Sequence, residues 1–158
     1  MATNRLLDVS YRAATFIGLA LLCSCGLPRL IIIHDPLTPQ EHLELGMAYE
    51  HRAEFEAALR EYNAASKTLP VAHLYIGNVR YQRQEYTKAE SAYRRAIETT
   101  DDPRAYNNLA WLYYTRNVHL PEALELARQA VQRDPLSNDF NDTLEKIRHK
   151  IEAEPSPE

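Results

Sequence analysis

Histidines, cysteines, serines and carboxylates are the side chains through which this chain could bind a metal or catalyse a reaction. Its six histidines are scattered, and no pair has the spacing and acidic neighbour of a helical zinc site. No serine lies in a glycine-flanked nucleophile elbow, and most of the 22 carboxylates stand near Arg or Lys, as on a solvated helix face. We therefore expect no metal, no other cofactor, no small-molecule substrate and no catalytic residue, so that the protein is not an enzyme.

The composition narrows the class of protein further. The 158 residues carry a formal net charge of −4, so no sequence-wide basic field is available to bind nucleic acid. Four glycines are too few for a glycine-rich phosphate loop or a tightly turned β fold. Two cysteines cannot form the disulfide framework of a small secreted scaffold. The length suits one globular domain, alone or with a short appendage.

The chain begins with a segment that has the features of a secretory signal. A short basic start precedes the apolar run 13–22, which is too short to span a bilayer. The run leads into Leu22-Cys23-Ser24-Cys25, which resembles a bacterial lipobox. The resemblance implies that residues 1–24 are a lipoprotein signal peptide, with cleavage after Ser24 and acylation of Cys25. An ordinary secretory signal or a buried N-terminal helix is the alternative.

The residues after the acylated cysteine predict a location and a tether. In lipoproteins, an aspartate directly after this cysteine retains the protein at the inner membrane. Gly26 stands there instead, so the resemblance favours lipid anchoring in the outer membrane, facing the periplasm. The tether covers residues 25–38 and contains the apolar run 30–33, which prefers an extended backbone. This run is interpreted as a strap packed on the first helices or as an edge open to a partner's β-sheet.

From residue 38 onward, small and aromatic residues recur at a nearly constant spacing. In the first two units a glycine is followed twelve positions later by an alanine and, four further on, by a tyrosine. The third unit has alanine in place of both the glycine and the tyrosine, and one residue is inserted near Val118. The three sets are Gly46, Ala58 and Tyr62; Gly77, Ala89 and Tyr93; and Ala110, Ala123 and Ala127.

This pattern resembles the tetratricopeptide repeat, a helix–turn–helix of about 34 residues, and the resemblance covers roughly residues 39–136. It implies an all-α, right-handed α-solenoid of three such units. Two helices can approach closely only where side chains are small, and a glycine inside a helix costs about 1 kcal/mol relative to alanine. The glycines therefore predict helix crossings that exclude larger groups, with the tyrosines filling the wider gaps.

The repeat positions also predict the bounds of the helices. The first helices of the units are expected at 39–52, 71–84 and 103–116, and the second helices at 55–67, 87–99 and 120–132. Thr38-Pro39-Gln40-Glu41 has the pattern of a capped helix start. An apolar stripe over 137–151 predicts a C-terminal capping helix, which completes a repeat domain over 39–151. The short acidic segment 152–158 is expected to be a disordered tail.

In the tetratricopeptide family, a row of side chains on the first helices lines the concave surface and binds peptides. The corresponding row here combines aromatic anchors, which suit side chains of a peptide, with amides, which suit its backbone. The same face carries Glu50 and Gln82. Alternatively, some of the row packs on the capping helix or the strap, Trp111 above all. The predicted groove residues are Met47, Leu74, Asn78, Tyr81, Arg104, Asn107, Trp111 and Tyr114.

The resulting hypothesis is a non-catalytic adaptor, anchored by lipid in a bacterial cell envelope, that binds another protein or a peptide in its concave groove. The basic residues of the carboxylate clamp in chaperone-binding family members are not matched as a set, so recognition of a chaperone's C-terminal tail is not expected. Two alternatives stay open. One is an accessory subunit of an envelope peptidase or exporter, and the other is a soluble co-chaperone whose N-terminus is never processed.

Overall fold

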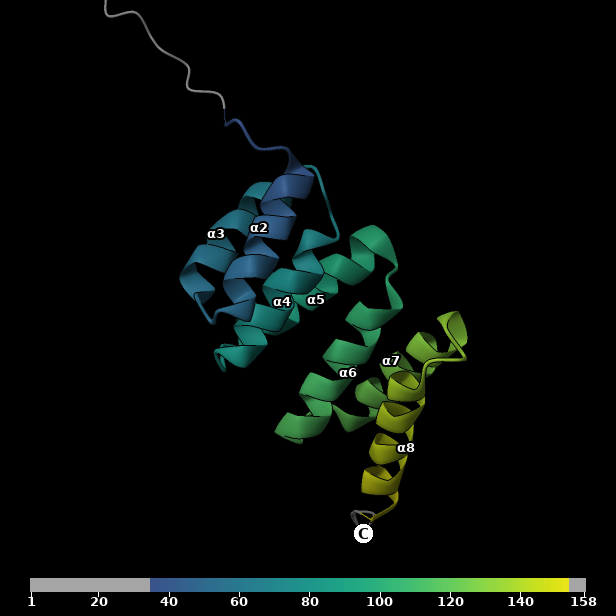
Figure 1. Ribbon diagram of the computed structural model, residues 1–158. Helices are drawn as coiled ribbons and strands as arrows, with labels where there is room; N and C mark the ends of the chain where they lie inside the picture. The colour runs from purple at the N-terminus through teal and green to yellow at the C-terminus, as the bar shows by residue number, and fades with distance from the viewer. Residues whose placement is uncertain (1–34, 154–158) are drawn as a thin grey trace, which may run out of the picture. The chain divides into compact units, whose positions relative to one another are not determined.

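The computed structural model describes residues 35–153, and all regular structure in this part of the chain is α-helical (Figure 1). The predictions for residues 1–24, for Cys25 and for the strap at 30–33 lie outside the described residues. None of the described helices is both long and apolar enough to cross a membrane. The helices are α2 (Pro39–His51), α3 (Phe55–Ala65), α4 (Ala72–Gln82), α5 (Tyr86–Thr100), α6 (Pro103–Arg116), α7 (Leu120–Arg133) and α8 (Asn138–Ala153).

Six of these helices form three successive hairpins. Helix α2 pairs with α3, α4 with α5, and α6 with α7, while α8 packs mainly against α7 and also against α6 (Figure 1). Each hairpin also packs on the next, through α3 with α4 and α5 with α6. The predicted solenoid of three helix–turn–helix units with a capping helix is therefore confirmed.

The hairpins begin and turn where the local sequence favours it. Thr38 and Glu41 form the predicted capping box, since the Thr38 side chain accepts from the Glu41 amide and the Glu41 carboxylate accepts from the Thr38 amide. Each turn places one residue in the left-handed backbone region, seven positions after the small residue of the preceding helix. The third turn contains a second one, which accommodates the inserted residue. These residues are Ala53, Gln84 and Asn117, and the second one in the third turn is His119.

Close approach of the paired helices depends on glycine in the first two hairpins. A Cβ added at Gly46 would lie 2.5 Å from two ring carbons of Tyr62, and one added at Gly77 would meet the ring of Tyr93 in the same way. Both rings are almost completely buried, and so are the alanines of the second helices. The packing role predicted for the repeat positions is therefore confirmed.

Only α6 has both of its predicted bounds, and the other helices differ from the prediction by one or two residues at one end or both. Helix α3, for example, ends at Ala65 rather than at residue 67. Helix α4 ends at Gln82 rather than at residue 84, because Gln84 adopts φ 60° in the turn. Helix α8 continues to Ala153, so the first two residues assigned to the acidic tail are helical.

Candidate functional site

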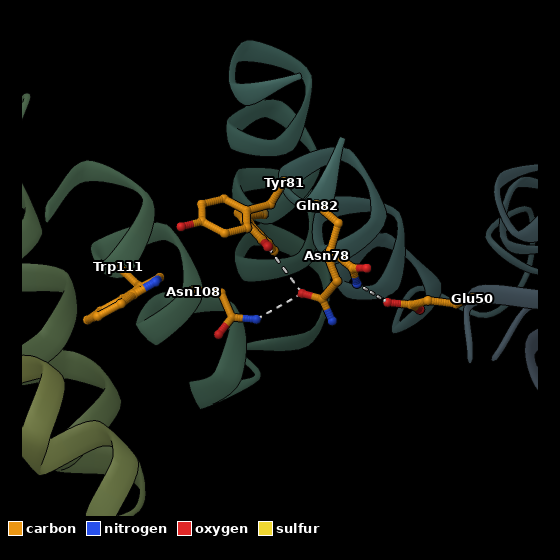
Figure 2. Close-up of a pocket in the computed structure, with 7 residues that line it drawn as sticks. Glu50, Asn78, Tyr81, Gln82, Asn108 and Trp111 are labelled. Carbon is orange, nitrogen blue, oxygen red and sulfur yellow. Dashed lines mark hydrogen bonds between the residues drawn. The ribbon is translucent and has the colours of Figure 1, made fainter. Parts of the chain in front are cut away.

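The first helices of the three hairpins line a hollow of about 280 Å³ (Figure 2). Helix α2 contributes one side chain to this hollow, α4 contributes three and α6 contributes two. One tyrosine of α5, the second helix of its hairpin, also lines the hollow. The rings around the hollow can bury apolar side chains, and the amides and the carboxylate can form hydrogen bonds with a ligand. The lining residues are Glu50, Asn78, Tyr81, Gln82, Tyr93, Asn108 and Trp111.

Two asparagine amides lie between the ends of the hollow, and one of them is fixed by the core. The Asn78 Oδ1 atom accepts hydrogen bonds from Tyr93 Oη at 3.1 Å and from Asn108 Nδ2 at 2.9 Å (Figure 2). Burial raises the pKa of the Tyr93 hydroxyl well above its ordinary value, so this group remains a donor at physiological pH. Asn78 Nδ2 is thereby left as a donor and Asn108 Oδ1 as an acceptor, with no further partner among the described residues.

The α2 end of the hollow holds a carboxylate with two neutral donors. Glu50 Oε1 accepts from Gln82 Nε2 at 2.6 Å (Figure 2). Glu50 Oε2 accepts from Tyr62 Oη at 2.7 Å. Burial and this bond to Glu50 raise the pKa of the Tyr62 hydroxyl, which therefore stays protonated and donates. Among the described residues, no Lys, Arg or His forms an ion pair with Glu50.

A second hollow of about 390 Å³ continues from the first along α2 and α4. Three polar side chains, Glu50, Asn78 and Gln82, line both. They therefore stand where the two hollows meet, and a ligand that fills either one contacts them. The remaining residues of the second hollow are Met47, His51 and Tyr75.

The α6 end of the hollow is bounded by the capping helix. The Trp111 ring packs against the Tyr114 ring with centroids 5.2 Å apart. Lys146 Nζ lies 5.3 Å from the centroid of Trp111, and Lys150 Nζ lies 4.8 Å from that of Tyr114. Lys150 also donates to the Tyr114 carbonyl oxygen at 3.0 Å. The expectation that part of the aromatic row packs on the capping helix is confirmed for Tyr114, whereas Trp111 contacts this helix and still lines the hollow.

Four of the eight predicted groove residues line at least one of the two hollows. They are Met47, Asn78, Tyr81 and Trp111.

The other four have different surroundings. Leu74 is only 2% exposed and belongs to the hydrophobic core with residues of α5 and α6, so its assignment to the groove surface was wrong. Its position on α4 lies where the next hairpin packs. Arg104 pairs with Asp102, the N-cap of α6. Asn107 lines neither hollow, and its buried Oδ1 has no hydrogen-bond partner within residues 35–153. Tyr114 is the fourth, beneath Lys150.

The predicted groove set lacks six lining residues: Glu50, Gln82, Tyr93 and Asn108 of the first hollow, and His51 and Tyr75 of the second. Glu50 and Gln82 do lie on the helix face that the sequence indicated, whereas Tyr93 and Asn108 were missed for different reasons. Tyr93 was assigned to packing alone, because the repeat spacing predicts a buried ring at this position. The same spacing gives no indication of where the hydroxyl group forms its hydrogen bond. Asn108 stands three residues before Trp111 and Asn107 stands four before it, so both are compatible with the same helix face. The helical spacing alone could not choose between the two amides.

The chain forms three helix hairpins, and their first helices line a polar and aromatic hollow. This arrangement defines a helical-repeat module with a surface that can bind a ligand. The tetratricopeptide repeat family model matches residues 43–103 and, in an overlapping second match, residues 76–138. The chain therefore belongs to the tetratricopeptide repeat family. No protein with a curated description matches the sequence.

Solved structures with the same fold come from several sources. The first tetratricopeptide domain of Spaghetti (RPAP3), bound to the HSP90 peptide SRMEEVD, has a TM-score of 0.68 and 17% identity, covering 77% of this chain and 99% of that one. The Sgt2 domain from Aspergillus fumigatus has a TM-score of 0.67 and 18% identity, covering 76% and 86%. MamA from Desulfovibrio magneticus RS-1 has a TM-score of 0.63 and 19% identity, covering 73% and 67%. At these identities the likeness establishes the fold alone.

Proposed function

We propose that this chain is a non-catalytic adaptor that binds an extended segment of another protein in the hollow on α2, α4 and α6. The observation that carries this proposal is the amide pair of Asn78 and Asn108. The fold uses Asn78 Oδ1 and Asn108 Nδ2, and leaves the opposite atom of each amide unused beside an open hollow. A donor next to an acceptor matches the C=O and N–H groups of a peptide backbone.

The aromatic rings supply the second half of the recognition. Tyr81 and Trp111 are partly buried and line the hollow, so their rings bury apolar area against a ligand side chain without losing much conformational freedom. The Tyr81 hydroxyl lies 3.2 Å from Thr115 Oγ1, which ties α4 to α6 across the hollow. A site held in this way is already arranged before the partner binds.

The ligand in the Spaghetti structure is an acidic peptide, and the hollow of this chain does not suit such a ligand. Its sequence, SRMEEVD, contains three acidic residues. The lining of the hollow here includes Glu50 and no lysine or arginine. A carboxylate-rich ligand would therefore face repulsion with no compensating cation at this site.

Site-specific photocrosslinking in intact cells tests the adaptor function. A photoreactive residue at Gln82, which is exposed and lines the hollow, should capture one defined protein. The same residue at Arg128, exposed on α7, is the matched control and should not capture it. Adding Trp111→Ala should weaken capture at Gln82 while the helical content measured by circular dichroism stays the same. Equal capture at both positions, or capture that ignores Trp111→Ala, contradicts the proposal.

We also propose that the chain is lipid-anchored in a bacterial envelope through Cys25, in the outer membrane with the repeats facing the periplasm. The support is the lipobox resemblance of residues 22–25 and the glycine at position 26. Labelling with a fatty-acid analogue should be lost in Cys25→Ala and retained in Cys23→Ala. Equal labelling of the parent and Cys25→Ala would contradict the proposed lipid anchor at Cys25. It would favour the alternative of a soluble co-chaperone whose N-terminus is not processed.

A further inference from the structure

The charge at the junction of the two hollows indicates which side chain the partner contributes. Glu50 is the acidic residue in the lining of both hollows, and neither lining contains lysine or arginine. Its two hydrogen-bond donors, Gln82 and Tyr62, are neutral. A carboxylate can accept about four hydrogen bonds, so about two positions on Glu50 remain open.

Three basic side chains on the adjoining helices are already paired. Arg104, at the start of α6, pairs with Asp102 and hydrogen-bonds to Tyr75, which lines the second hollow. Lys146, at the Trp111 end, contacts Asp142 at 2.6 Å. Arg83, at the end of α4, pairs with Glu56 at 2.9 Å and with Glu85 at 2.8 Å. These cations therefore do not neutralise Glu50, and the negative charge of the site is left for a ligand. His51, which lines the second hollow, is the one histidine in either lining.

Aromatic rings complete the surroundings of this carboxylate. Tyr75 and Tyr81 line the hollows on either side of the shared residues Asn78 and Gln82. The face of a tyrosine ring attracts a cation, and a planar guanidinium stacks on such a ring while it donates two parallel hydrogen bonds to a carboxylate. A lysine ammonium is a more strongly hydrated point charge and gains less from this combination.

We propose that the site formed by Glu50, Asn78, Tyr81 and Gln82 binds an arginine side chain of the partner's peptide. The guanidinium donates to Glu50 and stacks on tyrosine, and the peptide bond beside this arginine pairs with Asn78 Nδ2 and Asn108 Oδ1. This inference rests on the proposed peptide-binding function and specifies its ligand. The partner segment is therefore basic at the position that enters the hollow.

The single tryptophan of the chain makes the test direct. Trp111 lines the hollow and is the one tryptophan in all 158 residues, so its fluorescence reports on occupancy of the site. The purified full-length chain is titrated with three blocked tripeptide amides: acetyl-Gly-Arg-Gly, acetyl-Gly-citrulline-Gly and acetyl-Gly-Glu-Gly. Citrulline has nearly the shape of arginine but no charge. The ionic strength is kept constant, which separates binding from screening.

The arginine tripeptide should give a saturable change in Trp111 emission, with affinity about tenfold higher than the citrulline tripeptide, as expected for one charge-assisted pair at a partly exposed site. The Glu50→Gln variant should reduce the arginine affinity to the citrulline level. Glu98→Gln, which changes an exposed carboxylate on α5, is the matched control and should leave the affinity unchanged. Circular dichroism of both variants verifies that the helices are intact.

Equal affinity for arginine and citrulline, preference for the glutamate tripeptide, or no saturable response to arginine overturns the inference. None of these results affects the adaptor function if the photoreactive residue at Gln82 still captures a partner in a Trp111-dependent manner. Loss of that capture contradicts the proposed function itself, so the two failures are distinguishable.

Discussion

Replacing Gly46 by alanine tests whether a buried tyrosine imposes glycine on the first helix. The new Cβ would lie 2.5 Å from Cδ1 and Cε1 of Tyr62 and 3.2 Å from Cγ. Carbon atoms pack at about 3.5–4.0 Å, so the ring must retreat by about 1 Å. Tyr62 is 0% exposed, and its ring lies 5.4 Å from that of Tyr75, centroid to centroid. The ring therefore cannot move without disturbing its neighbours.

Two opposing effects set the size of the change. Alanine gains about 1 kcal/mol over glycine inside a helix, whereas overpacking a core costs about 1–3 kcal/mol. Contact with a fully buried ring places the cost at or above the top of that range. We expect Gly46→Ala to lower the free energy of unfolding by about 2 kcal/mol and the melting temperature by roughly 5–10 °C. The moving ring should also disturb the 2.7 Å hydrogen bond from Tyr62 to Glu50.

The assay is urea and thermal unfolding, followed by circular dichroism, in two backgrounds. In the Tyr62→Ala background the steric conflict is absent, so Gly46→Ala should raise the stability through helix propensity. The third repeat already has this arrangement, since Ala110 and Ala127 stand at the corresponding positions and both are 0% exposed. Stabilisation by Gly46→Ala in the parent, or the same sign in both backgrounds, would refute the steric reasoning.

Three further substitutions test the core, the site and a surface ion pair. Leu74→Ala should lower the free energy of unfolding by about 2–5 kcal/mol, because the side chain is 2% exposed. Unchanged unfolding in urea would contradict the assignment of Leu74 to the core and support its original assignment to the groove. Tyr93→Phe should cost about 1 kcal/mol and weaken peptide capture, since it removes the bond that orients Asn78, and undiminished capture would contradict that arrangement. The hydrogen bond from Arg133 lowers the pKa of Asp101 below its ordinary value of 3.8, so the stabilisation is present above pH 3.8 and is lost as the pH falls through the lowered pKa. Asp101→Asn should therefore lower the melting temperature at pH 7 by an amount that shrinks below pH 3.8, and a pH-independent difference would exclude the ionic explanation.

The helices could be predicted from the sequence because their signals are local and repeated. The spacing of small residues places each helix crossing, and Thr38 with Glu41 marks a helix start through contacts within one turn. Even the insertion near Val118 has a local consequence, a second left-handed residue in the third turn. Errors in the helix bounds are confined to one or two residues at either end, where helix termini are least sharply defined.

The site was predicted less completely, because it depends on how one hairpin packs on the next. Leu74 and Asn78 lie one turn apart on α4, yet the first is covered by the following hairpin while the second faces the hollow. The choice between Asn107 and Asn108 depends on the rotation of α6 about its axis, which the periodicity of a single helix does not define. These are long-range packing effects, and no short spacing in the sequence encodes them.

The buried tyrosines show why packing and recognition cannot be separated in this chain. The ring of Tyr62 fills the gap opposite Gly46, and its hydroxyl donates to Glu50; the ring of Tyr93 fills the gap opposite Gly77, and its hydroxyl donates to Asn78. In both hairpins the aromatic residue of the repeat motif therefore orients a polar group of the hollow. The third hairpin has Ala127 at this position and orients no group in this way. The polar groups that a repeat tyrosine holds in place therefore lie on the first two hairpins, whereas α6 of the third hairpin contributes Asn108 and Trp111 to the hollow without such support.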